Sequence, residues 1–178
     1  LTRRVNRLAE GTRTRVCGIF EWSLGDKTRK ANAAVVGWGN TRRIIVSDTL
    51  LENFSGQEIE VIMAHEIWHH AKNHIWLTMA LQSVLTAGAF YGAHQLLEPV
   101  STRIGFQGVS DIAGFPLFVL MMSLLSLLTL PAVNSFSRYL EKAADLYALE
   151  VTGDSFAFVS CMEKLADLNL ADKSPNKV

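Results

Sequence analysis

Two long stretches of the chain carry no charged side chain, and they dominate its pattern of hydrophobic and polar positions. Neither residues 75–97 nor residues 112–137 contain Asp, Glu, Lys or Arg. Each run is long enough to cross a hydrocarbon layer of about 30 Å as a helix. We therefore predict membrane-spanning helices at 75–97 and 112–133, and expect Pro131 to kink or end the second. Two buried helices of a soluble protein are the weaker alternative, because two such runs in one small domain are unusual.

Shorter apolar runs near the N-terminus have the composition of β-strands. They cover residues 16–22, 33–38 and 43–47, and a Gly-Asn-Thr turn at 39–41 joins the last two. An exposed edge strand can hold an extended peptide by main-chain hydrogen bonds. A purely structural sheet is an equally good interpretation. The residues to which we assign the substrate-binding role are Asn32, Ala33, Ala34 and Val35.

A further helix is predicted between the strands and the first apolar run. Ser55 and Glu58 have the spacing of a capping box, with Ser55 as the N-cap. Apolar side chains then recur at helical spacing, which predicts a helix over about residues 57–72 that can continue into the apolar run.

The middle of this helix reads His65-Glu66-Ile67-Trp68-His69, the pattern H-E-x-x-H. Two His residues at i and i+4 lie one turn apart on one face, so their imidazoles can reach a single Zn²⁺. Glu66 then projects beside the metal, where a bound water would be. The alternative is a surface helix that carries His and Glu for solubility alone.

A metalloprotease site of this kind needs a third protein ligand, and the segment 134–145 offers one. Glu141 and Asp145 are four residues apart, so both carboxylates face the same way. Glu141 can ligate zinc while Asp145 accepts a hydrogen bond from the outer nitrogen of a ligand His. By itself the segment better fits a charged helix face with Arg138, but the His pair upstream reverses that preference.

The zinc hypothesis also predicts a topology. If the three candidate ligands share one metal, the chain before residue 75 and after 133 lies on one side, and 98–111 is the far loop. Of the 17 Lys and Arg residues, only Arg103 falls in that loop. The positive-inside rule therefore puts the metal site on the cytoplasmic face.

Composition narrows the class of protein. A length of 178 residues suits one domain, and a formal net charge of zero gives no indication of nucleic-acid binding. The content of 49% hydrophobic and 19% charged residues favours a membrane protein. Cys17 and Cys161 are isolated, which fits a reducing compartment. The chain begins at Leu1, so we expect it to be part of a longer protein. The pattern of residues 1–10 predicts a basic helix that is either membrane-associated or simply solvated.

Four segments together carry a family resemblance. They are Asn32-Ala33 with Gly37; Thr41-Arg42-Arg43-Ile44-Ile45-Val46-Ser47-Asp48-Thr49-Leu50-Leu51; His65-Glu66-x-x-His69 with His74; and Ser137-Arg138-x-x-Glu141-x-x-Ala144-Asp145. This combination resembles the integral-membrane CAAX prenyl proteases, the a-factor-converting zinc metalloproteases. Heat-shock relatives of the HtpX type share the two metal motifs.

The resemblance implies a mainly α fold with a small β-sheet (α+β). It implies one gluzincin-type metalloprotease domain over 1–178, with a two-helix transmembrane hairpin between the H-E-x-x-H helix and a third-ligand helix in 134–178. It also implies roles for individual residues: His65, His69 and Glu141 as zinc ligands, Glu66 as general base, and Asp145, Arg138 and Asn134 as residues that shape the site. The chain departs from the family at Trp68, where a small residue is usual, and we expect this side chain to narrow the packing near the metal.

We predict a membrane-embedded zinc metalloendopeptidase with one Zn²⁺ per chain, acting on a peptide or protein substrate. We expect it in a lipid bilayer, a bacterial inner or ER-type membrane, with its site facing the cytoplasm and no nucleic-acid partner. One alternative is a non-proteolytic zinc-binding scaffold or sensor, which would not need Glu66; another is a membrane-helix interaction module with incidental His residues. His70 or His74 is a further candidate to stabilise the oxyanion, the alternative being an ordinary helix-face residue.

Overall fold

The computed structural model describes residues 8, 11–12, 16–23, 32–37, 39–106 and 111–168. The predicted basic helix over 1–10 therefore lies outside the described residues, apart from Leu8. The chain divides into two compact units. The first comprises Leu1–His74 and Leu140–Val178, and the second comprises Ile75–Tyr139.

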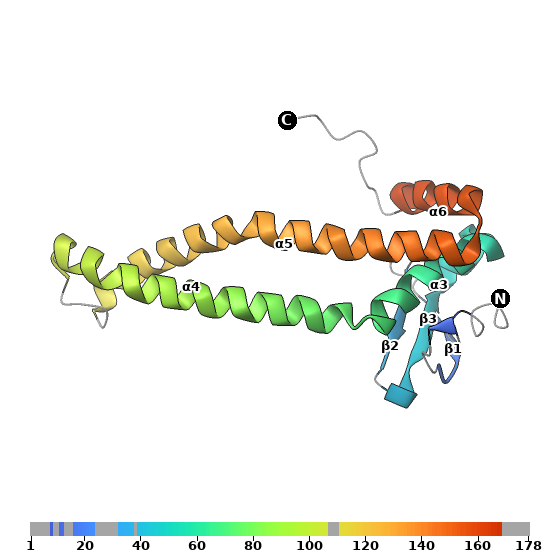
Figure 1. Ribbon diagram of the computed structural model, residues 1–178, viewed down its shortest axis with the longest axis horizontal. Coiled ribbons are helices and arrows are strands. Elements are labelled where there is room, and N and C mark those ends of the chain that lie inside the picture. The colour runs from blue at the N-terminus through green and yellow to red at the C-terminus, as the bar shows by residue number, and fades with distance from the viewer. Residues whose placement is uncertain are drawn as a thin grey trace. The chain divides into compact units, whose positions relative to one another are not determined.

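The first unit contains a three-stranded sheet (Figure 1). Its strands are β1 (Ile19–Trp22), β2 (Ala33–Val36) and β3 (Arg43–Ser47), in the order β1-β3-β2. β3 pairs in parallel with β1 and antiparallel with β2. The third strand has the predicted bounds, whereas the first two are shorter than predicted. The second ends before Gly37, whose φ of +97° belongs to a turn; a Cβ at this position would lie only 2.6 Å from the Thr41 carbonyl oxygen.

The predicted turn at 39–41 is a short 3₁₀ helix, η1 (Gly39–Thr41), and β3 leads directly into α2 (Asp48–Asn53). The next helix, α3 (Gly56–Ala71), begins with the predicted capping box. Ser55 Oγ accepts from the Glu58 N–H at 3.3 Å, and a Glu58 carboxylate oxygen accepts from the Ser55 N–H at 2.7 Å. These reciprocal bonds satisfy two donors at the helix start and fix where α3 begins.

The expected continuation of α3 into the apolar run is not found. Asn73 has a φ of +54°, a left-handed conformation that an α-helix cannot include. A separate helix, α4 (His74–Ile104), begins at the next residue. It passes through Pro99 and extends beyond the predicted end at residue 97, so the loop predicted at 98–111 is shorter than expected.

The predicted boundary between the second apolar helix and the third-ligand helix is wrong. After η2 (Ile112–Gly114), one helix, α5 (Phe115–Thr152), runs from the apolar segment through both candidate carboxylates. Figure 1 shows it as one continuous ribbon. Pro131 lies inside α5 and does not end it. An interior proline lacks the N–H for one intrahelical hydrogen bond, a loss that apolar helices tolerate.

Only one helix among the described residues is long and apolar enough to cross a membrane. It covers Ile112–Thr152, with a mean hydropathy of 2.1 and 6% burial over its most apolar window. α4 is long enough but is not apolar enough to qualify, because polar side chains such as Gln82, His94 and Gln95 lower its mean hydropathy. The span predicted at 75–97 therefore remains a prediction.

The hydrophobic core of the first unit surrounds α3. α3 packs against β2 and the C-terminal helix α6 (Ser155–Leu168), and Ile44 and Val46 of β3 belong to the same buried cluster. The members from α3 are Ile59, Val61, Ile62, Met63, Ala64 and Ile67. Because α3 is buried along most of its length, the H-E-x-x-H segment has a rigid support.

A buried carboxylate ties the start of α3 to α6. Glu58 is 3% exposed, and its oxygens accept from Ser160 Oγ at 2.6 Å and Lys164 Nζ at 2.8 Å, in addition to the Ser55 N–H. Burial opposes ionisation, but the hydrogen bonds from Lys164, Ser160 and Ser55 outweigh it and lower the pKa of Glu58 to about 2. Glu58 is therefore an ionised crosslink between two helices at neutral pH.

We expect Glu58→Gln to reduce the free energy of unfolding at pH 7 by on the order of 2 kcal/mol. Because folding lowers the pKa of Glu58 from 4.5 to about 2, its stabilisation is full above pH 4.5 and disappears as the pH falls through 2. Thermal unfolding in detergent between pH 7 and 3 should show the difference from the parent shrinking with acid. The exposed neighbour Glu52 provides the control, Glu52→Gln. A constant difference across this range would contradict the prediction.

Candidate metal centre

Three candidate ligand atoms converge at the surface of the first unit. His65 Nε2 lies 3.0 Å from His69 Nε2, and Glu141 Oε2 lies 3.4 Å and 3.7 Å from these two nitrogens, respectively. A tetrahedral zinc with bonds of about 2.0–2.1 Å holds its ligand atoms about 3.3 Å apart. The spacing of the three atoms therefore fits a single ion of this size, and three protein ligands leave one position for water or substrate.

Each ligand is placed by regular helix geometry. His65 and His69 are one turn apart on α3, and their ring centroids are 4.7 Å apart. Glu141 and Asp145 are one turn apart on the last part of α5, which belongs to the first unit. Asp145 Oδ1 lies 2.9 Å from His65 Nδ1 and accepts a hydrogen bond from its N–H, which leaves the His65 Nε2 lone pair free for a metal.

The remaining predicted site-shaping residues, Asn134 and Arg138, lie on the part of α5 that belongs to the second unit. Both side chains are exposed. Their role at the metal stays a prediction.

Glu66 follows His65 on α3 and is half-buried. Burial raises the pKa of its carboxyl, the charge of Glu141 raises it further, and His65 opposes both. A carboxyl whose pKa is raised from the usual 4.5 toward neutrality is better suited to take a proton and later return it.

Two further imidazoles lie near the candidate ligands. His74 Nδ1 is 2.9 Å from His69 Nδ1, and the two rings meet edge to face with centroids 4.8 Å apart. Burial is the main reason why the pKa values of His69 and His74 are lowered. Burial lowers the pKa of His70, the charge of Arg42 lowers it further, and a hydrogen bond with the Val35 backbone partly opposes both. The sequence made His70 and His74 candidates to stabilise the oxyanion, but it did not predict that His74 contacts the candidate ligand His69.

Trp68, the residue that departs from the family pattern, packs between α3 and α5. Its indole stacks on Tyr147 with centroids 4.2 Å apart and an interplanar angle of 17°, and Lys72 Nζ lies 4.6 Å from the ring centroid. Trp68 Nε1 is buried and has no hydrogen-bond partner among the described residues. The stack therefore joins the helix of the His pair to the helix of the carboxylates.

The four residues predicted to bind substrate lie at and just before β2, an edge strand of the described sheet. The Asn32 N–H donates to Ser47 Oγ at 3.0 Å, and the Asn32 carbonyl accepts from the Ser47 N–H at 2.9 Å. Pairing alternates along an antiparallel ladder, so Ala34, opposite Ile45, also faces β3. The main-chain groups of Ala33 and Val35 therefore face the free edge of β2.

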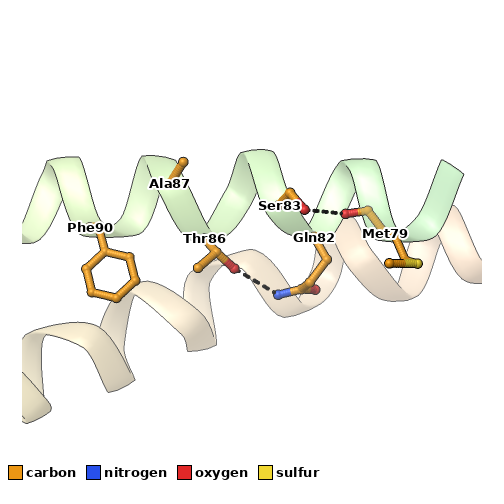
Figure 2. Close-up of a pocket in the computed structure, with 6 residues that line it drawn as sticks. All are labelled: Met79, Gln82, Ser83, Thr86, Ala87 and Phe90. Carbon is orange, nitrogen blue, oxygen red and sulfur yellow. Dashed lines mark hydrogen bonds between the residues drawn. The ribbon is translucent and has the colours of Figure 1, made fainter. Parts of the chain in front are cut away.

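A cavity of about 570 Å³ lies on α4, in the second unit (Figure 2). None of its lining residues is charged, and the polar ones bond within the helix: Gln82 Nε2 donates to Thr86 Oγ1 at 3.4 Å, and Ser83 Oγ donates to the Met79 carbonyl at 2.8 Å. Ala87 and Phe90 complete the lining. This cavity offers no ionisable group for catalysis.

The chain is similar in sequence to known metalloproteases. The model of peptidase family M48 matches residues 1–175. An uncharacterized metalloprotease, YhfN of Bacillus subtilis, is 34% identical over 161 residues, which is 88% of this chain and 38% of the relative. The protease HtpX of Acinetobacter baumannii (strain AYE) is 26% identical over 84% of this chain and 51% of the relative. A CAAX prenyl protease 1 homolog of Dictyostelium discoideum is 29% identical over 75% of this chain and 32% of the relative.

The fold has a solved counterpart in Ste24p of S. mikatae, which superposes with a TM-score of 0.75 at 24% identity over 98% of this chain and 45% of that chain. The likeness supports the mainly helical fold with a small sheet. The chain spans about half or less of the length of each of these relatives. Since the family model matches almost all of its residues, the chain belongs to peptidase family M48 and is a metalloprotease homologue.

Proposed function

We propose that the chain is the catalytic core of a zinc-dependent membrane endopeptidase, with His65, His69 and Glu141 as the metal ligands. The observation that carries the proposal is the convergence of two Nε2 atoms and one Oε2 atom at 3.0–3.7 Å, the spacing that a tetrahedral zinc requires. When bound, zinc supplies a Lewis acid that polarises the scissile carbonyl and lowers the pKa of water.

Residues around the metal have three further roles: proton transfer, orientation of a ligand and alignment of the two helices. Glu66 takes the proton from the attacking water and returns it to the leaving amine, a use supported by the burial that raises its pKa. Asp145 keeps the proton of His65 on Nδ1 and so keeps Nε2 available. The Trp68–Tyr147 stack holds α3 against α5, so that ligands from the two helices stay in register.

The substrate lies along the free edge of β2 as an added strand. Ala33 and Val35 direct their main-chain donors and acceptors to that edge, and an extended peptide pairs with them whatever its side chains.

The two apolar segments cross the bilayer as a hairpin, and the metal site faces the cytoplasm. The hydropathy of Ile112–Thr152 and the uncharged run of residues 75–97 support the hairpin. The single basic residue in the segment 98–111, Arg103, supports the orientation.

We expect Glu66→Gln to lower the rate of peptide hydrolysis by about 10²–10⁴-fold while zinc content stays near one ion per chain, because the amide cannot accept the water's proton. Glu141→Ala should lose both activity and most of the zinc. Metal analysis and a peptide-cleavage assay on the purified chain separate the two effects. Hydrolysis by Glu66→Gln at the parent rate would show that this carboxylate is not the base, and a zinc-loaded but inactive parent would favour the scaffold alternative.

Substrate pairing at the edge of β2 is tested with two prolines. Ala33→Pro removes an N–H that points to the free edge, so kcat/KM should fall by roughly tenfold with little change in thermal unfolding. Ala34→Pro removes an N–H that faces β3, so it should lower the unfolding temperature. If Ala33→Pro cleaves peptides as well as the parent, the substrate does not pair with this edge.

Orientation in the membrane is tested by cysteine labelling. Cys17 is exposed and lies on the proposed cytoplasmic side, whereas Thr102 is exposed near the end of α4. In intact bacterial spheroplasts, a membrane-impermeant maleimide should label Thr102→Cys in a Cys17→Ser background, and should label Cys17 of the parent only after lysis. The reverse pattern would place the metal site outside, and labelling of both before lysis would exclude the spanning hairpin.

A further inference from the structure

The two candidate ligand imidazoles each direct Nδ1 at a partner, but the partners differ in kind. His65 Nδ1 meets the Asp145 carboxylate at 2.9 Å, and His69 Nδ1 meets His74 Nδ1 at the same distance. We propose that His74 is a positioning residue whose Nδ1 accepts a hydrogen bond from the Nδ1–H of His69 and thereby holds His69 in the metal-binding tautomer. This inference rests on the proposed function, since it takes His69 as a ligand.

The chemistry of facing imidazole nitrogens allows two arrangements. A neutral imidazole has one N–H donor and one bare acceptor nitrogen, so a contact of 2.9 Å between two Nδ1 atoms needs a proton on one of them. If His74 donated, His69 would carry its proton on Nε2, the atom that lies 3.0 Å from His65 Nε2, and it could not bind a metal there. If His69 donates, its Nε2 lone pair is available and His74 carries its proton on Nε2. Only the second arrangement is compatible with a metal.

The break between α3 and α4 is what places His74. Asn73 adopts the left-handed conformation, with a φ of +54°, and its N–H donates to the His70 carbonyl at 3.3 Å. His74 follows as the first residue of α4 and is 7% exposed. Asparagine is one of the few residues that tolerate this conformation. The short interruption therefore turns the chain so that His74 meets the outer edge of the His69 ring.

A neutral partner at His69 has a chemical consequence. An anionic acceptor raises the basicity of a ligand imidazole and adds negative charge near the metal. Asp145 does this for His65, and Glu141 contributes a second carboxylate as a ligand. With a neutral imidazole as its Nδ1 partner, the His69 ring is oriented without a carboxylate bound to that nitrogen.

The test compares two substitutions of His74 in the full 178-residue chain in detergent, with zinc affinity measured by competition with a chromophoric chelator. His74→Phe keeps a ring but removes the acceptor, so the zinc Kd should rise roughly 10–100-fold. His74→Asn restores an acceptor oxygen, so its Kd should lie within about threefold of the parent value. His70→Phe is the matched control and should leave the zinc Kd unchanged.

Thermal unfolding of the metal-free variants separates positioning from structural damage. We expect the metal-free His74→Phe and His74→Asn chains to unfold at similar temperatures while their zinc Kd values differ. If the parent binds zinc and His74→Phe binds it equally well, or if Asn fails to rescue the affinity, the role of His74 is overturned and the proposed function stands. If the parent itself binds no zinc, both proposals fail.

Discussion

One hydrogen bond, between His65 Nδ1 and Asp145 Oδ1, marks the contact on which the candidate metal site depends. It joins α3 to α5 across 80 residues of sequence, and it brings Glu141, one turn earlier on α5, to the two imidazoles. In the sequence, all of α4 and most of α5 separate the His pair from Glu141 and Asp145. Ligands this far apart in the chain can share a metal only if the two helices have one fixed register, because zinc–ligand distances tolerate errors of only a few tenths of an ångström.

The first unit supplies that register through several independent contacts. The core around α3 excludes water from its apolar side, and the ionised Glu58 crosslinks its first turn to α6. Near its other end, the Trp68–Tyr147 stack joins α3 to α5. A site built on well-packed helices is held more closely than one built on loops, which is what preorganised catalysis requires. Trp68, which departs from the family motif, therefore contributes contacts that the motif alone does not explain.

Local sequence signals located most of the elements. The capping box at Ser55 and Glu58, the bounds of β3 and the helical setting of H-E-x-x-H were all predicted, because they depend on spacings of a few residues. At two positions the local signals left more than one outcome open. Pro131 was expected to kink or end the apolar helix; α5 does not end there, because one lost hydrogen bond is small against the rest of a long helix. The apolar pattern allowed a continuous helix from α3 into α4, and it contains no information about the left-handed Asn73 that separates them.

The sequence by itself determined the chemistry that is available: the residue types, their spacing on each helix and the two uncharged runs, since helix periodicity converts spacing directly into a shared face. It could pair Glu141 with the His residues only as a hypothesis, because contacts between distant segments depend on how whole helices pack. The tertiary structure decided which atoms meet, namely Nε2, Nε2 and Oε2 at the candidate centre, Asp145 behind His65 and His74 behind His69. It also decided that Trp68 packs against Tyr147, which no spacing rule predicts because the two residues meet only after α3 and α5 come together.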